Sequence, residues 1–143
     1  MKKLLLDTCA ISELVKTNPS PSFISWISVQ DEDFLYLSVI TIGEIFCGVS
    51  KLPNGKKRDK LLDWVGAELP ERFYGRIIPV GVEVAAKWGE LCGSSERIGA
   101  KLPVVDSLIA ATAMAHGMEV VTRNTDDFKR CGATVLNPWD GSV

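Results

Sequence analysis

The sequence predicts a single α/β domain with three layers and a parallel sheet of about five strands. Short apolar segments alternate along the chain with segments whose apolar residues have helical spacing, an order typical of strands joined by right-handed crossovers. The 143 residues match the length of one ordinary domain. The chain contains no linker, low-complexity tract or internal repeat, so residues 1–143 are expected to form one domain.

The first half of the chain predicts two strands and four helices. The strands are residues 2–6 and 34–37, and the helices are residues 9–16, 20–29, 40–52 and 55–69. Asp7 and Thr8 offer capping oxygens to the first helix, and Ser20 followed by Pro21 suits the start of the second. A turn at residues 53–55 separates the last two.

The second half predicts three strands and two helices. The strands are residues 76–80, 119–122 and 134–136, and the helices run through residues 84–91 and over residues 104–116. The last helix is the most regular of the chain, because it opens after Pro103 and is followed by Gly117, a residue that favours the position after a helix end.

Composition excludes several function classes. The net charge is −2, which by itself argues against a nucleic-acid or membrane partner, since such binders are usually basic. The N-terminal apolar run is too short for a signal peptide or a spanning helix. Four widely spaced cysteines predict reduced thiols in a cytoplasmic protein: Cys9, Cys47, Cys92 and Cys131. The one histidine, His116, cannot build a zinc site and is expected at a helix end.

Acidic residues follow the predicted strands at four distant points of the sequence. Asp7 follows the first strand, Glu44 lies in the helix after the second, Asp106 begins the helix after Pro103, and Asp127 follows the fourth strand with Asn124 and Asp126. Ligands of open parallel sheets bind outside the carboxyl ends of the strands. The four acids are therefore expected at one edge of the sheet.

All of these acids except Glu44 also have a simpler explanation. Asp7 and Asp106 suit helix caps, and Asp126 or Asp127 alone suits a solvated turn. Glu44 stands among apolar residues, where a lone carboxylate is costly. Two carboxylates about 5 Å apart repel by about 3 kcal/mol at an effective dielectric of about 20. A cluster of such oxygens without His or Cys partners favours Mg²⁺ or Mn²⁺, ions that assist displacement at a phosphodiester.

The segments that carry these acids resemble the PIN-domain family, and within it the VapC-like toxin branch with its FitB-like relatives. The matching segments are LLLDT at residues 4–8, LSVITIGEI at 37–45, LPVVDSLIAATA at 102–113 and VTRNTDDF at 121–128. The likeness extends to GRIIPV at 75–80 and LNPW at 136–139. The resemblance implies a sheet of order 3-2-1-4-5 and a Mg²⁺- or Mn²⁺-dependent endoribonuclease. It also implies a homodimer or a dimer of such dimers, inhibited by a VapB-like antitoxin.

The resemblance also implies a role for each acid. Asp7 and Asp106 would be the principal metal ligands, Glu44 would complete the cluster and orient or deprotonate the attacking water, and Thr122 would offer a hydroxyl. Many relatives have asparagine where this chain has Cys9, so a polar contact is expected to be absent at this position. Some carry aspartate at the position of Asn124, while others use the acid before the phenylalanine, which here is Asp127, the fourth acid we predict. The resemblance leaves open whether the site binds one metal ion or two.

Other features leave alternatives open. Residues 51–60 carry five basic side chains against one acidic, which suits either a solvated helix face or phosphate contact. Trp26, Trp64 and Trp88 fit apolar helix faces better than base stacking. A catalytically silent interaction module and a Mg²⁺-dependent phosphoacceptor domain are the rival functions, although the latter needs a lysine after the fifth strand. With the four acids assigned to a metal, 14 acidic residues face 16 basic ones, so the net charge no longer excludes RNA.

Overall fold

The computed structural model describes residues 2–141 of the chain. Its sheet has the order β3-β2-β1-β4-β5, and every neighbouring pair is parallel. The strands are β1 (Leu4–Leu6), β2 (Leu35–Ser38), β3 (Ile77–Ile78), β4 (Glu119–Val121) and β5 (Val135–Leu136). The predicted α/β class and strand order are therefore confirmed.

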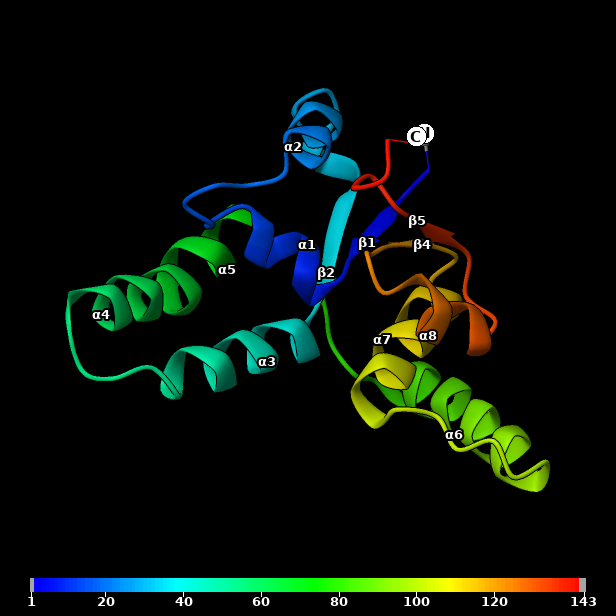
Figure 1. Ribbon diagram of the computed structural model, residues 1–143. Coiled ribbons are helices and arrows are strands. Elements are labelled where there is room, and N and C mark those ends of the chain that lie inside the picture. The colour runs from blue at the N-terminus through cyan, green and yellow to red at the C-terminus, as the bar shows by residue number, and fades with distance from the viewer. Residues whose placement is uncertain (1, 142–143) are drawn as a thin grey trace.

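The helices form the outer layers of the molecule. They are α1 (Thr8–Glu13), α2 (Pro21–Ser28), η1 (Glu32–Phe34), α3 (Val39–Ser50), α4 (Lys56–Asp63), η2 (Trp64–Glu68), α5 (Leu69–Arg72), α6 (Val82–Arg97), α7 (Val104–Ala115) and α8 (Thr125–Arg130). In Figure 1, α1, α3, α4 and α5 lie to one side of the sheet and α6, α7 and α8 to the other.

Two helical segments differ from the sequence prediction. The predicted helix over residues 55–69 contains a π-helical segment, η2, between α4 and α5. Pro70, in the first turn of α5, has no backbone N–H and cannot continue an unbroken ladder of hydrogen bonds. No helix was predicted after β4, but the acids there begin the short helix α8, which has acidic residues in its first turn and basic ones in its last.

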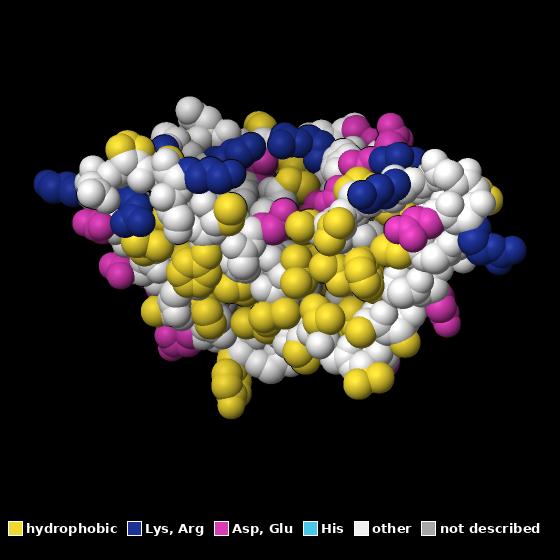
Figure 2. All heavy atoms as spheres, turned by 90° about the horizontal axis from the view of Figure 1, so that it is seen from below, with side chains coloured by type: hydrophobic (Ala, Val, Ile, Leu, Met, Phe, Trp, Pro, Cys, Tyr) yellow, Lys and Arg dark blue, Asp and Glu magenta, His cyan; other side chains and the backbone are white. Residues whose placement is uncertain are grey.

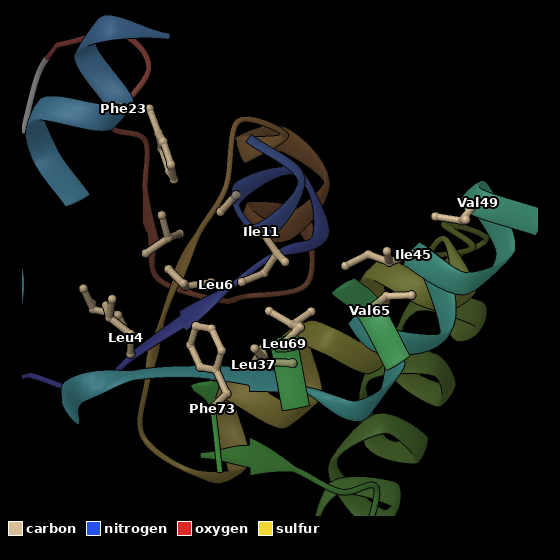
Figure 3. Packing of buried hydrophobic residues seen from close by; sticks show 13 residues of the cluster. Leu4, Leu6, Ile11, Phe23, Leu37, Ile45, Val49, Val65, Leu69 and Phe73 are labelled. Atoms are coloured by element: carbon tan, nitrogen blue, oxygen red, sulfur yellow. The ribbon is translucent and has the colours of Figure 1, made fainter. Parts of the chain in front are cut away.

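The buried strand β1 explains the run of three leucines near the N-terminus. Successive side chains of a strand point to opposite faces. Leu4 and Leu6 pack with Phe23 and Phe73 in one cluster, shown in Figure 3. Leu5 joins Phe128 in the cluster on the other face. Because β1 is central and covered on both faces, all three residues are apolar.

The pairing of β1 with β4 brings two distant polar residues together. Leu6 is the register partner of Val121, and the backbone N–H of Asp7 donates to the carbonyl of Val121 at 3.0 Å. Asp7 directly follows β1 and Thr122 directly follows β4. The two residues therefore lie side by side at the carboxyl edge of the sheet. This edge carries the acids that the sequence singled out.

Several smaller expectations are also met. All four cysteines are free thiols. His116 is the C-cap of α7, at the expected helix end. Trp26 and Trp64 pack against the core, and the indole of Trp88 donates to the Ser107 hydroxyl at 3.0 Å. Within residues 2–141, no helix combines the length and the apolar character needed to cross a bilayer.

Candidate active site

Asp7 is the most deeply buried acid of the site, with 5% of its surface exposed. It caps α1, because its Oδ1 accepts the Thr8 N–H at 2.7 Å. Its Oδ2 accepts the hydroxyl of the buried Thr122 at 2.8 Å. Burial raises the pKa of Asp7, and hydrogen bonds from Thr122, Thr8 and Cys9 offset only part of this effect. Asp7 is thus both a helix cap and a costly buried carboxylate.

Glu44 reaches the same place from α3. Its Oε1 accepts the hydroxyl of Thr8, and that hydroxyl lies 3.5 Å from the Oγ1 of the buried Thr41. Thr8 therefore holds two acids at once, Asp7 through its backbone N–H and Glu44 through its side chain. Glu44 is half-buried. The hydrogen bond from this hydroxyl reduces the free-energy cost of burying the Glu44 carboxylate among apolar residues.

Asp106 lies in the first turn of α7, as the sequence predicts. Its pKa is raised to about 6, first by burial and then by the negative charges of Asp7, Asp127 and Glu44. Such charge effects act over short range in a protein. The four predicted acids therefore share one region, and their repulsion disfavours a charged Asp106.

Asp127 sits at the outer side of this region, in the first turn of α8. Its Oδ2 accepts the Asn124 amide at 2.8 Å, and its Oδ1 pairs with Arg130. These hydrogen bonds from Asn124 and Arg130 lower the pKa of Asp127. The same Asn124 amide nitrogen donates to Asp106 Oδ2 at 3.1 Å. Asn124 thus links the third and fourth acids.

Three of the four acids border a hollow of about 360 Å³. It is lined by Asp7, Thr8, Cys9, Ser12, Glu44, Asp106, Arg123 and Asn124. Figure 2 shows acidic side chains in the middle of the face seen from below, bordered by Lys and Arg on one side and by apolar side chains on the other. Asp127 does not line the hollow itself.

The oxygen atoms that the lining residues offer as ligands suit a hard divalent cation. Among the described residues, no three Asp, Glu, His or Cys side chains converge closely enough to enclose an ion by themselves. Mg²⁺ seldom needs such a cage, because it keeps several waters and binds through one or two carboxylates. The oxygen donors and the raised pKa of Asp106 therefore fit Mg²⁺ or Mn²⁺.

Two further hollows continue from the acidic one along α1. The nearer, of about 400 Å³, shares Thr8, Ser12 and Glu44 with it. The outer, of about 620 Å³, shares Ser12, Val15, Lys57, Leu61 and Trp64 with the nearer one and is also lined by Lys16, Thr17, Lys60 and Glu68. We call these two hollows the α1 groove. It is the place where the basic segment of residues 51–60 approaches the acidic site.

A model of the PIN domain matches residues 4–133 of the chain. The chain belongs to the PIN domain family. The resemblance drawn from the four acidic segments is thereby confirmed, and the match spans all of them.

Relatives of this PIN domain cover nearly its whole length. VapC ribonuclease Y4jK of Sinorhizobium fredii is 35% identical over 137 residues, which are 96% of this chain and 98% of the relative. Toxin FitB of Neisseria gonorrhoeae is 35% identical over 136 residues, 95% of this chain and 98% of the relative. The solved structure of FitAB bound to an IR36 DNA fragment has a TM-score of 0.87 at 36% identity and covers 95% of both chains.

Sequence reasoning missed three contributors to the site of this PIN domain. Thr8 was expected only as a capping residue, although its position directly after Asp7 places its hydroxyl at the same edge. Arg130 received no role, although it lies three residues after Asp127 and pairs with it on α8. Cys9 was expected to lack a polar contact. Its Sγ lies 3.6 Å from both Asp7 Oδ2 and Thr122 Oγ1, and it accepts the Arg123 N–H at 3.4 Å.

Proposed function

We propose that this chain is a metal-dependent endoribonuclease that acts as the toxin of a VapBC-type toxin–antitoxin pair. The observation that carries the proposal is the meeting of Asp7, Glu44 and Asp106 around one hollow, with Asp127 near enough to raise the pKa of Asp106. The relatives' names, a VapC ribonuclease and a FitB toxin, support the substrate class and the biological role.

The proposed cofactor is Mg²⁺ or Mn²⁺. Asp7 and Asp106 are the proposed principal ligands, Glu44 completes the set inside the hollow, and Asp127 is the fourth acid at its outer side. When bound, the ion neutralises charge that develops on the phosphodiester during an in-line displacement. Repulsion among the carboxylates supports this proposal, since bound positive charge would relieve it.

The chain's own residues would then orient the reacting groups. The Thr8 N–H and the Thr122 hydroxyl hold the two oxygens of Asp7, so this carboxylate has one orientation. The Thr8 hydroxyl holds Glu44. We propose that Glu44 orients the attacking water and accepts its proton, and that Arg123 at the rim of the hollow contacts a phosphate of the RNA.

The test is cleavage of cellular RNA by the purified chain, with RNA ends mapped, in Mg²⁺, in Mn²⁺ and in EDTA. Asp7→Asn and Asp106→Asn should abolish cleavage with the fold intact by circular dichroism. Asp126→Asn is the matched control, because it removes an exposed acid next to Asp127 and should leave cleavage near the wild-type rate. Full activity in EDTA would refute the metal-dependent mechanism.

Two rival functions predict different results for the same purified protein. A catalytically silent module would fold and bind its partner but would not bind Mn²⁺ in calorimetry. A phosphoacceptor domain would form a stable aspartyl phosphate with a small phosphodonor. Leu136 ends β5 and is followed by Asn137 rather than by the lysine that such domains normally need, which disfavours the second rival.

The proposed protein partner is a VapB-like antitoxin, supported by the likeness to Toxin FitB and to the solved structure of FitAB. We place it in the α1 groove, because that groove has apolar side chains such as Leu61 and Trp64, a rim of lysines and an inner end at Glu44. Val15→Asp should prevent co-purification with the antitoxin while RNA cleavage persists. Val29→Asp, at an exposed residue outside the groove, is the control. Co-purification of the Val15 variant at wild-type yield would contradict this placement.

A second copy of the chain is the other proposed protein partner. A band of apolar side chains crosses the face seen from below in Figure 2, beside the acidic side chains. Exposed apolar residues of α3 and α7 include Val39, Phe46 and Val104. Contiguous apolar surface of this kind commonly marks an interface. Phe46→Asp should convert a dimer to a monomer in light scattering, and an unchanged mass would exclude Phe46 from the interface.

A further inference from the structure

Asn124 occupies a distinctive place among the acids. Its Nδ2 lies 3.1 Å from Asp106 Oδ2 and 2.8 Å from Asp127 Oδ2. Carboxylate oxygens accept hydrogen bonds and do not donate them when charged, so the amide NH₂ rather than the amide oxygen faces both acids. One neutral side chain thus bridges two carboxylates that come from different helices, α7 and α8.

The Asn124 amide uses the oxygens that a second divalent cation would need as ligands. Mg²⁺ and Mn²⁺ bind carboxylate oxygens, and Asp106 Oδ2 and Asp127 Oδ2 both already accept a hydrogen bond from Nδ2. The second oxygen of Asp127 is also engaged, since Oδ1 pairs with Arg130. Both oxygens of Asp127 therefore already have protein donors.

The other acids are arranged differently. Asp7, Glu44 and Asp106 line the hollow, while Asp127 does not. Asp7 and Glu44 take their hydrogen bonds from separate atoms, Asp7 from the Thr8 N–H and the Thr122 hydroxyl and Glu44 from the Thr8 hydroxyl. The hollow among the lining acids thus leaves room for an ion, whereas Asp106 and Asp127 already share the Asn124 amide nitrogen.

We infer that the Asn124 amide takes the place of a second metal ion, so that this chain binds one divalent cation rather than two. The inference rests on the proposed function, because it concerns how many ions that site holds. Asn124 and Arg130 together satisfy Asp127 with the protein's own donors. Aspartate at position 124 would remove the NH₂ donors and add a carboxylate between the two acids, which creates the ligand set for a second ion.

The experiment counts Mn²⁺ bound per chain by isothermal titration calorimetry, with electron paramagnetic resonance of the same samples. The wild type should bind one equivalent and give the spectrum of an isolated ion. Asn124→Asp should bind two, a doubling of the stoichiometry, with the signal broadened by coupling between neighbouring ions. Asn54→Asp is the matched control. It makes the same substitution at an exposed turn residue far along the chain and should stay at one equivalent.

Each outcome separates this inference from the proposed function. Two equivalents in the wild type would overturn the inference and leave the metal-dependent nuclease intact, and this count needs no variant to fold. One equivalent in a folded Asn124→Asp chain would also overturn it. No Mn²⁺ binding by the folded wild type would instead refute the proposed metal site, and the inference with it. If Asn54→Asp also gained an ion, added charge rather than position 124 would be the cause.

Discussion

The candidate site has two halves that are built in different ways. The inner half joins β1 to α3, and its acids Asp7 and Glu44 are held by Thr8 and Thr122. The outer half joins the first turns of α7 and α8. Its acids are Asp106 and Asp127, bridged by an amide and bordered by an arginine.

The difference lies in burial and in the kind of donor. In the inner half, Asp7 and Thr122 are buried and neutral donors hold the carboxylates in place. In the outer half, a charged guanidinium and an exposed amide balance the negative charge. We conclude that the inner half determines geometry and the outer half adjusts charge. Substitution of Asp127, which does not line the hollow, should therefore affect catalysis less than substitution of Asp7.

The largest expected effect is the loss of RNA cleavage when one acid from each half is replaced. Asp7→Asn should lower cleavage at least about a thousandfold, while Asp127→Asn should lower it about tenfold. Asp127 does not line the hollow and accepts a hydrogen bond from Asn124, so its charge acts less directly. Single-turnover cleavage at saturating Mg²⁺ measures both. Equal losses for the two variants would remove the distinction between the halves.

The next effect concerns Thr8, the residue that joins the two inner acids. Thr8→Val keeps the side-chain shape and the N–H that caps Asp7 but removes the hydroxyl that Glu44 accepts. We expect a loss of about 10- to 100-fold in kcat with little change in KM, because Glu44 loses its orientation. Thr8→Ser should recover most of the rate, and Thr17→Val, at an exposed residue, should match the wild type. A wild-type rate in Thr8→Val would show that Glu44 does not need this contact.

A smaller effect is the pH dependence of stability in EDTA. The folded-state pKa of Asp106 is about 6 against an ordinary 3.8, so the folded state binds more protons than the unfolded state between these values. Stability therefore falls as pH rises from about 4 to 6 and stays low above that range. Asp106→Asn should flatten this decline.

The same substitution, Asp106→Asn, should also change the free energy of unfolding. Because Asp106 is half-exposed and screened by solvent, Asp106→Asn should gain only about 1–2 kcal/mol of unfolding free energy at pH 8. Urea titrations at pH 4 and pH 8 measure the gain, which should shrink at pH 4 and also when Mg²⁺ is added to the wild type. An equal effect at both pH values would show that charge repulsion is not its cause.

The smallest effect is expected from Arg130. Arg130→Gln removes the cation that pairs with Asp127 on the surface of α8, so the pKa of Asp127 should rise toward its ordinary value. The melting temperature should change by less than about 3 °C, and the difference should vanish in 1 M salt. A larger change in melting temperature that persists in 1 M salt would show that Arg130 stabilises α8 by contacts other than its charge.

Most of the fold was predictable because the apolar pattern and the turn residues agree. Leu4 to Leu6 form a strand buried on both faces, and Pro103 and Gly117 mark the ends of the most regular helical pattern. The short helix α8 was not predicted, because in six residues its one buried apolar side chain, Phe128, shows no helical period.

The positions of the acids were also predictable, but their partners were not. Asp7, Glu44 and Asp106 were expected at one edge because parallel strands end there, and they do line one hollow. The hydroxyl of Thr8 between Asp7 and Glu44, and the amide of Asn124 between Asp106 and Asp127, depend on helix packing across distant segments. Sequence spacing carries no information about such side-chain directions.

The hydrogen bond between Asp7 and Thr122 has a consequence for protein synthesis. It joins residues 115 positions apart, and β1 reaches its neighbour β4 only after residues 119–121 exist. At about 5–20 residues per second, a ribosome needs several seconds to proceed from one to the other. A nascent chain therefore has no complete acidic site until the residues of β4 and Thr122 have been made. Under the proposed function, a shorter nascent chain could not cut RNA.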